Sequence, residues 1–225
     1  MGEAIGQSLV MAVGVALSPM PIIAVVLLLT TGGARRNGPA FVVGWLTGLA
    51  AIGVIVLAIA GPTAAGDQGQ PETWVIWLKL VLGVLLLVVA ARQFAGRPTA
   101  DAEPRMPSWM ENIDRFGAAR SLGTGAALAG VNPKNFLLAV SAGTAIAQTG
   151  IPGVQQAVAY GVFAVIGTLS VGAPVVFYLA MGDKSKAMLA AAKDWMGRHN
   201  AVIMSVVCLV IGVKLIGDFV TELGV

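Results

Sequence analysis

The chain has 225 residues, of which 57% are hydrophobic and only 11% are charged, and its mean hydropathy is +0.85. Because soluble globular domains carry about 25% charged residues, this composition excludes a soluble protein and indicates an integral membrane protein. The two longest hydrophilic stretches, near 96–118 and 182–199, are too short to bury a core of their own, and nothing suggests a nucleic-acid partner.

Apolar runs of about 20 residues predict membrane-spanning helices. In chain order we expect six, at about 4–30, 39–60, 74–95, 119–147, 155–181 and 200–222. The predicted fold class is therefore an all-α polytopic membrane protein with six transmembrane helices. Two connecting segments, 104–120 and 184–198, mix apolar and charged residues at spacings that suit short amphipathic helices on the inner membrane surface, with a solvated linker as the alternative.

The first and fourth predicted spans each contain a proline break, at Ser18-Pro19-Met20-Pro21 and at Asn132-Pro133-Lys134-Asn135. Proline inside a helix removes a hydrogen bond and clashes with the preceding turn, and such a break survives at membrane depth only where it faces protein or a water-filled cavity. The two breaks lie half a chain apart, and three spans per half is an odd number. We therefore predict a 3+3 inverted repeat, made of a first repeat at 1–95, a cytoplasmic amphipathic linker at 96–118 and a second repeat at 119–225.

Lys134 is the sharpest candidate for a functional residue, because an ammonium near the middle of a span costs several kcal/mol unless it is paired or hydrated. It lies on one polar face of its span with Ser141, and the neighbouring asparagines offer hydrogen-bond donors and acceptors. The candidate substrate-binding residues are Ser18, Pro19, Pro21, Asn132, Pro133, Lys134, Asn135 and Ser141. The alternatives are that Lys134 only caps carbonyls opened at the break, and that the first break is only a packing kink.

Three lysines lie within predicted spans, Lys79, Lys134 and Lys214, and no carboxylate lies deep in any span. A charged pocket would therefore be cationic and would suit an anionic headgroup such as phosphate, sulfate or carboxylate. Lys214 has Asp218 at the i,i+4 position and is a candidate ion pair with it, while Lys79 is expected to extend its ammonium to the membrane interface. The spacing of Gly44 and Gly48 predicts close helix packing, within the subunit or across a dimer.

The other Lys and Arg residues, of 14 in total, lie in the connections that follow the first, third and fifth spans. Basic connections remain in the cytoplasm, so both termini are predicted to be extracytoplasmic. The sequence has no metal-ligand cluster, nucleophile triad or phosphate-binding glycine loop, and its single cysteine, Cys208, cannot form an internal disulfide. We expect neither enzymatic activity nor a metal or other cofactor.

The Ser-Pro-x-Pro break, the Gly-Val-Asn-Pro-Lys-Asn stretch at 130–135 and the six spans in two halves resemble the LysE exporter superfamily. Within it the chain is similar to the GAP or Sap-like branch, the glycopeptidolipid and sulfolipid addressing proteins. The resemblance covers essentially the whole chain. It implies export of a cell-envelope lipid or glycolipid across the plasma membrane, often alongside a larger lipid transporter, and it makes a homodimer plausible. Met20 replaces the glycine of the Pro-Gly-Pro motif typical of amino-acid exporters, which argues against an amino-acid substrate.

The leading hypothesis from the sequence is an exporter or flippase-like transporter of an envelope lipid with an anionic headgroup. The two broken helices would form a site at the membrane midplane, with access alternating between the two sides. One alternative is a small-solute exporter of amino acids or cations. The other is a non-transporting membrane partner that recruits a larger envelope-lipid transporter through the basic connections.

Overall fold

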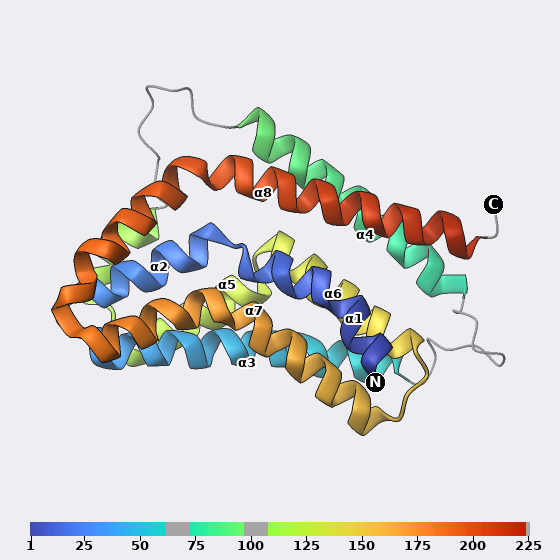
Figure 1. Cartoon of the computed structure of the whole chain (residues 1–225), viewed down its shortest axis with the longest axis horizontal. Helices are drawn as coiled ribbons and strands as arrows, with labels where there is room; N and C mark the ends of the chain where they lie inside the picture. The colour runs from blue at the N-terminus through green and yellow to red at the C-terminus, as the bar shows by residue number, and fades with distance from the viewer. Residues whose placement is uncertain (62–72, 97–107, 224–225) are drawn as a thin grey trace.

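The computed structural model describes residues 1–61, 73–96 and 108–223, and every regular element in these ranges is a helix. The long helices are α1 (Gly2–Ala16), α2 (Pro19–Thr30), α3 (Ala34–Ala60), α4 (Thr73–Ala95), α5 (Ala118–Gly130), α6 (Pro133–Gln148), α7 (Gly153–Met181) and α8 (Lys186–Glu222). Two short 3₁₀ helices, η1 (Ser108–Arg115) and η2 (Gly182–Ser185), complete the described chain. Figure 1 shows the long helices arranged as an elongated bundle, with both termini toward the same end.

Both predicted breaks are present, and each proline starts a new helix. Ser18 and Asn132 adopt extended backbone conformations as the N-caps of α2 and α6, and Pro19 and Pro133 occupy the first helical turn. Proline is well suited to this position because its missing N–H would have no partner inside the helix and its φ angle is already helical. The first break bends the chain by 52° between α1 and α2.

By length and composition, three helical stretches of the described chain could cross a membrane. They are Ala34–Ala60, Thr73–Ala95 and the long stretch Gly153–Glu222, and the bent pair of α1 and α2 would be a fourth. These helices bear out a multi-pass membrane protein. The six-span inverted repeat, its division at 95 and 119, and the linker at 96–118 stay predictions.

Helices from the two halves of the sequence pack against one another throughout the bundle. α3 lies along α5, α1 lies along α7, and α4 lies along α8. Glycines make the tightest approaches: a Cβ atom added to Gly44 would lie 1.9 Å from the carbonyl oxygen of Leu122, and one added to Gly125 would lie 2.2 Å from that of Phe41. The predicted close packing at Gly44 and Gly48 therefore occurs within the chain, between α3 and α5.

The two predicted amphipathic segments have different outcomes. Residues 186–198 are not a separate surface helix but the first turns of α8, which continues to Glu222, and this prediction was wrong because no proline interrupts the helix there. In the 104–120 segment, residues 104–107 lie outside the described chain. The rest forms η1 and the start of α5, and the side chain of Asn37 donates a hydrogen bond to the Phe116 carbonyl at 2.7 Å.

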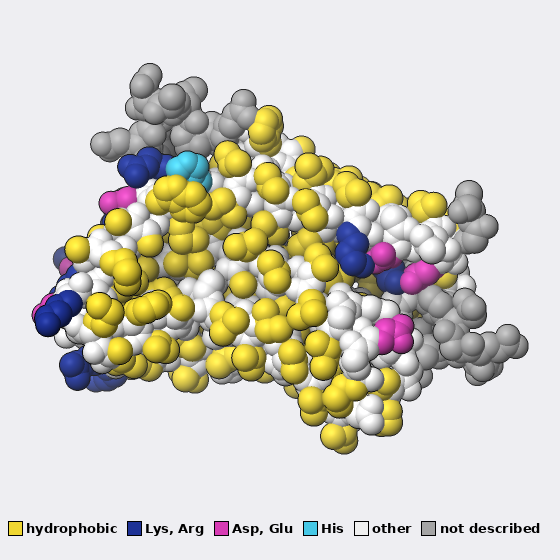
Figure 2. All heavy atoms as spheres, in the orientation of Figure 1, with side chains coloured by type: hydrophobic (Ala, Val, Ile, Leu, Met, Phe, Trp, Pro, Cys, Tyr) yellow, Lys and Arg dark blue, Asp and Glu magenta, His cyan; other side chains and the backbone are white. Residues whose placement is uncertain are grey.

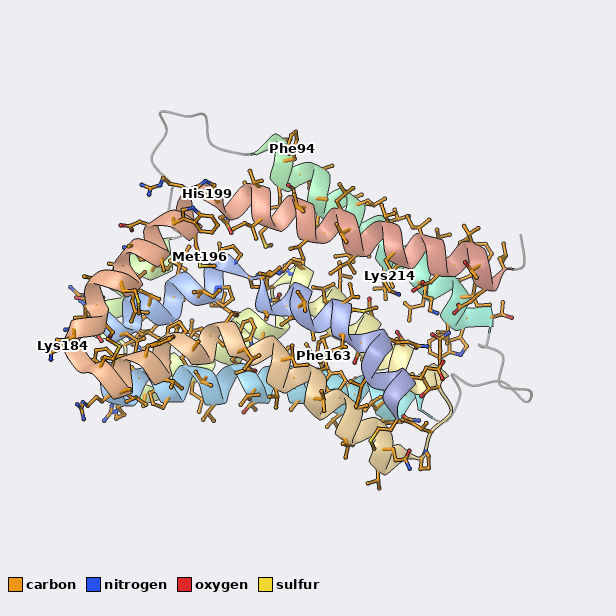
Figure 3. All side chains as sticks on the ribbon, viewed as in Figure 1. Phe94, Phe163, Lys184, Met196, His199 and Lys214 are labelled. Carbon is orange, nitrogen blue, oxygen red and sulfur yellow. The ribbon has the colours of Figure 1, made fainter. Side chains whose placement is uncertain are left out.

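The charged side chains on the visible face lie toward the two ends of the long axis of the molecule. Figure 2 shows apolar side chains over the middle of the visible face, with dark blue Lys and Arg gathered where α7 turns into α8. This end, which carries Arg35, Arg36, Lys184 and Lys186, is called the basic end, and the opposite end, toward the termini, is called the termini end. Figure 3 places Lys184 at the basic end and Lys214 toward the termini end. Exposed apolar residues such as Val54, at 69% exposure, are what a lipid-facing surface requires.

Candidate functional site

The ammonium of Lys134 lies at the junction of the two helix breaks. Its side chain is fully buried, and Nζ donates hydrogen bonds to the carbonyl oxygens of Gly14 at 2.7 Å and Leu17 at 3.3 Å. Both carbonyls belong to the C-terminal end of α1, where helix carbonyls lack intrahelical partners and the helix dipole is negative. The second break thus supplies the cation that satisfies the carbonyls opened by the first.

Asn135 connects the same two breaks through a second set of hydrogen bonds. The hydroxyl of Ser18 donates to Asn135 Oδ1 at 2.8 Å, and Asn135 Nδ2 donates to the carbonyl of Leu128 near the end of α5 at 3.1 Å. Asn132 caps its own helix, with Oδ1 accepting from the backbone N–H of Lys134 at 3.1 Å. Ser18 and Asn135 are both buried. The Ser18 hydroxyl and Asn135 Oδ1 are therefore satisfied by each other only while the two breaks stay together.

The two breaks can be aligned on Pro19 and Pro133, but their surroundings differ. Ser18 and Asn132 each precede a proline, so Met20 in the first break stands where Lys134 stands in the second. α1 packs along α6, and Lys134 fills that interface. α2 and α5 barely meet, and Met20 lines an open cavity instead.

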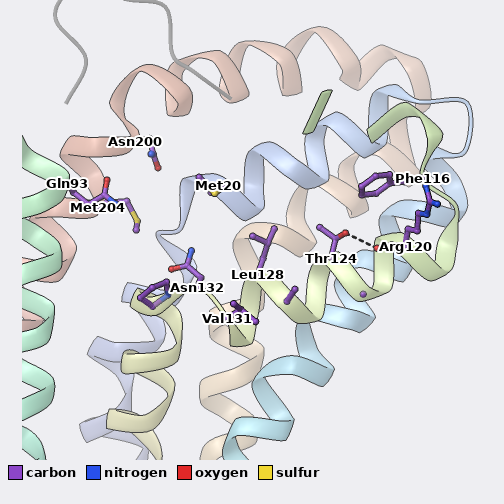
Figure 4. A pocket seen from close by; sticks show the side chains of 13 residues that line it. Met20, Gln93, Phe116, Arg120, Thr124, Leu128, Val131, Asn132, Asn200 and Met204 are labelled. Carbon is purple, nitrogen blue, oxygen red and sulfur yellow. Dashed lines mark hydrogen bonds between the residues drawn. The ribbon is translucent and has the colours of Figure 1, made fainter. Parts of the chain in front are cut away.

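That cavity, here called the vestibule, has a volume of about 700 Å³. Figure 4 shows its lining side chains, which come from α2, α4, α5, α8, the start of α6 and the connections before and after α5. They are Met20, Gln93, Phe116, Arg120, Gly123, Thr124, Ala127, Leu128, Val131, Asn132, Pro133, Asn200 and Met204. Most of the lining is apolar, while Arg120 brings a guanidinium and Gln93, Asn132 and Asn200 bring amides. A large apolar cavity with a few placed polar groups is the usual form of a site for a small amphiphilic molecule.

A smaller cavity lies between α1, α4, α6 and α8 at the termini end. It has a volume of about 130 Å³ and is lined by Lys79, Lys214, Asp218, Glu222 and Ser141, among others. Lys214 pairs with Asp218 as predicted, and Lys79 pairs with Glu222. The expectation that Lys79 reaches the interface was wrong, because α4 and α8 pack along each other and place Glu222 beside it. Lys79 is only 7% exposed.

The family model of Sap, the sulfolipid-1-addressing protein, matches residues 9–219. The chain belongs to the Sap family. Comparisons with curated proteins and with solved structures gave no match. The Sap family is associated with lipid addressing and transport rather than with enzymatic activity, so membership implies involvement in the addressing or export of lipid. The match confirms the Sap-like resemblance, while the wider LysE superfamily stays a prediction.

In this Sap-family chain the structure divides the predicted site residues into three places. Asn132 and Pro133 line the vestibule. The five others near the breaks are buried in the junction: Ser18, Pro19, Pro21, Lys134 and Asn135. Ser141 lines the small cavity, and its hydroxyl donates to the Leu137 carbonyl at 2.7 Å within its own helix.

Sequence reasoning missed the polar residues of the vestibule that lie outside the breaks. A signal for part of this surface was present in the Sap-family sequence: Phe116, Arg120, Thr124, Leu128 and Asn132 recur at intervals of four residues. Arg120, Thr124 and Leu128 lie on one face of α5, Phe116 precedes that helix and Asn132 follows it, and all five line the vestibule. Gln93 and Asn200 come from other helices, and no local spacing connects them to this face.

Proposed function

We propose that this chain exports a cell-envelope lipid or glycolipid with an anionic headgroup across the plasma membrane. Transport would proceed by alternating access between two inverted halves of three spans each. The observation that carries the proposal is the asymmetry at the junction: on one side α1 and α6 are held together through Lys134, and on the other the vestibule separates α2 from α5.

The helix packing supports two related halves. If α1 to α4 correspond to α5 to α8 in the same order, the contact of α1 with α7 has its counterpart in that of α5 with α3. The contact of α2 with α8 likewise corresponds to that of α6 with α4, and the contact of α2 with α7 to that of α6 with α3. Inverted-repeat transporters consist of two halves that form equivalent interfaces, and exchange between these interfaces opens the site to alternate sides.

The lining of the vestibule suits a lipid better than a small polar solute. Its apolar walls would accommodate acyl chains, while Arg120 offers a planar fork of donors that matches the oxygens of a sulfate, phosphate or carboxylate group. A pocket for an amino acid or a metal cation would need more polar groups and, for the cation, carboxylates. Among the described residues that line the vestibule there is no Asp or Glu.

Lys134 would act in the transition between the two states. Its ammonium is held by the carbonyl end of α1 in this conformation, and movement of α1 away from α6 would release it toward the substrate path. A headgroup anion could then replace those carbonyls as its partner, so the buried charge is never left without compensation. In this proposal Ser18, Pro19, Pro21, Asn132, Pro133, Asn135 and Ser141 form the path around Lys134.

The charge distribution sets the proposed orientation. With the basic end in the cytoplasm, both termini are extracytoplasmic and the vestibule would accept lipid from the cytoplasmic side. The proposed partners are membrane lipids, a larger envelope-lipid transporter that would receive the cargo, and a second copy of the chain in a homodimer.

The experiment fills the vestibule without disturbing the fold. Gly123 lines the vestibule, and a Cβ atom added there meets nothing within 4 Å, as is also true of Gly217 on α8. Gly123→Trp should abolish delivery of the envelope lipid to the cell surface in a strain that lacks the gene, measured by surface extraction and mass spectrometry, whereas Gly217→Trp should restore it. Full delivery by a stably expressed Gly123→Trp variant would contradict the proposal.

A further inference from the structure

The small cavity at the termini end, here called the ion-pair cavity, holds charges that the junction does not use. Lys79 and Lys214 line it together with Asp218 and Glu222, and each ammonium bonds to one carboxylate. Lys79 comes from α4 and the other three residues from α8. Charged residues within membrane-spanning helices are costly and mark the paths of ions and substrates.

Stability alone is a weak reason for these pairs. Partly exposed ion pairs contribute only about 0–1 kcal/mol, and the exposed fraction is 33% for both side chains of the Lys214–Asp218 pair and 9% and 25% for those of Lys79 and Glu222. One of these pairs is also incompletely satisfied, because Glu222 binds Lys79 through Oε1 while Oε2 is buried without a hydrogen-bond partner. Because one of its buried oxygens is unbonded, Glu222 binds Lys79 less favourably than a fully hydrogen-bonded carboxylate would, and an incoming anion could displace it.

The position of the ion-pair cavity relates it to the vestibule. The vestibule lies among α5, α2, α4 and α8, and exchange of the two halves turns these helices into α1, α6, α8 and α4, which surround the ion-pair cavity. The two cavities lie toward opposite ends of the chain, since Arg120 and Asn200 of the vestibule belong to the basic-end parts of α5 and α8 and Lys214 to the termini-end part of α8. The ion-pair cavity is therefore the closed counterpart of the open vestibule.

We propose that the ion-pair cavity is the exit-side binding site for the anionic headgroup. Lys79 and Lys214 would bind the sulfate, phosphate or carboxylate group as it leaves the junction. Glu222 and Asp218 compensate the two ammoniums while the site is empty and closed, and the arriving anion displaces them. This inference rests on the proposed export function, because it names where the cargo binds after the halves have moved.

The test uses inorganic sulfate as the probe and the full chain purified in detergent micelles. The measurement is the rise in unfolding temperature with sodium sulfate relative to sodium chloride at equal ionic strength, since a ligand that binds only the folded state raises that temperature. The combined variant Glu222→Gln with Asp218→Asn should bind sulfate about tenfold more tightly than the wild type, because no carboxylate competes. Lys79→Gln with Lys214→Gln should lose the sulfate-specific rise.

The matched control is the exposed ion pair of Asp183 and Lys186 at the basic end. Like the pairs of the ion-pair cavity, it joins one carboxylate to one ammonium. Asp183→Asn with Lys186→Gln should leave the sulfate response unchanged. If the lysine variant fails to fold, Lys79→Arg with Lys214→Arg keeps the charges and should retain the response. Sulfate binding that is no tighter in the carboxylate variant, or that survives in the glutamine variant of the lysines, would overturn the assignment, because a purely structural role predicts no opposite effects.

A second arm separates a lipid headgroup from a free anion. Sulfated galactosylceramide in the micelles should raise the unfolding temperature through the same lysines, and uncharged galactosylceramide should not. A response to inorganic sulfate without a response to the sulfated lipid would show a free-anion site and would overturn the headgroup proposal. This experiment is independent of the export assay with Gly123→Trp. If Gly123→Trp abolishes export but sulfate does not stabilise the purified protein, only the exit-side site is refuted.

Discussion

Replacing Lys134 by methionine separates the role of its charge from its role in packing. Methionine keeps most of the volume of the fully buried side chain but removes the two hydrogen bonds to Gly14 and Leu17. Each bond to a charged group contributes about 1.5–3 kcal/mol, and the substitution also removes the desolvation cost of a buried ammonium, which is of order several kcal/mol. Because the two effects oppose each other, we expect a net change in unfolding free energy within about 2 kcal/mol.

For a chain of this size, a change of about 2 kcal/mol shifts the unfolding temperature by roughly 4–8 °C. Export should nevertheless fall to background, because no cation remains at the junction to accompany the headgroup. Export is measured as surface lipid by mass spectrometry, and the change in stability is measured as the unfolding temperature of the purified variant.

The control for general destabilisation is Leu86→Ala on α4, at a fully buried position away from both breaks. Truncating a buried leucine costs about 2–5 kcal/mol, as much as or more than Lys134→Met is expected to cost. This variant should still export lipid as long as it is folded at the assay temperature. Wild-type export by Lys134→Met, or equal loss of export in both folded variants, would refute the role of the charge.

Three further predictions concern packing, the junction and orientation. Gly44→Ala should prevent stable folding, because its Cβ atom would lie 1.9 Å from a backbone oxygen of α5, whereas Gly161→Ala, with nothing within 4 Å, should leave the unfolding temperature within a few degrees of wild type. Ser18→Ala and Asn135→Ala should show a coupling of about 0.5–1.5 kcal/mol in a double-mutant cycle of unfolding free energies, and strictly additive effects would show that their hydrogen bond contributes nothing. A cysteine introduced at Lys184, in a chain otherwise free of cysteine, should be protected from a membrane-impermeant maleimide in intact cells and react after lysis. Labelling in intact cells would show that the orientation is the opposite of the predicted one.

Much of the architecture could be predicted because membrane helices have strong local signals. The apolar runs located the helices, and the prolines at 19 and 133 located the breaks, since proline in a helix interior removes a hydrogen bond and clashes with the preceding turn. Proline alone does not decide a break, because Pro39 and Pro174 lie inside α3 and α7. The length of α8 was not predicted, because the rise in hydropathy near residue 200 indicates the start of the apolar span and not the start of the helix, which is Lys186. A water-exposed segment without proline continues a helix as readily as an apolar one.

The site was predictable only in the parts that local sequence determines. Lys134 stood out because of its cost in an apolar span, yet its partners, the carbonyls of Gly14 and Leu17, lie about half a chain away and have no side-chain signal. The pairing of Lys79 with Glu222 likewise depends on which helices pack together. Lys214 and Asp218 were predictable because one turn of a single helix brings them into contact.

The central claim is that the chain itself moves lipid between leaflets, and reconstitution tests it most directly. Purified protein in liposomes that contain a fluorescent sulfated glycolipid would be assayed for transfer of the label to the opposite leaflet, by the fraction that an impermeant quencher reaches with time. We predict that wild-type protein moves the lipid faster than protein-free liposomes and that Lys134→Met protein does not. Equal rates in all three preparations would contradict lipid transport by this chain and would favour a non-transporting partner of a larger transporter.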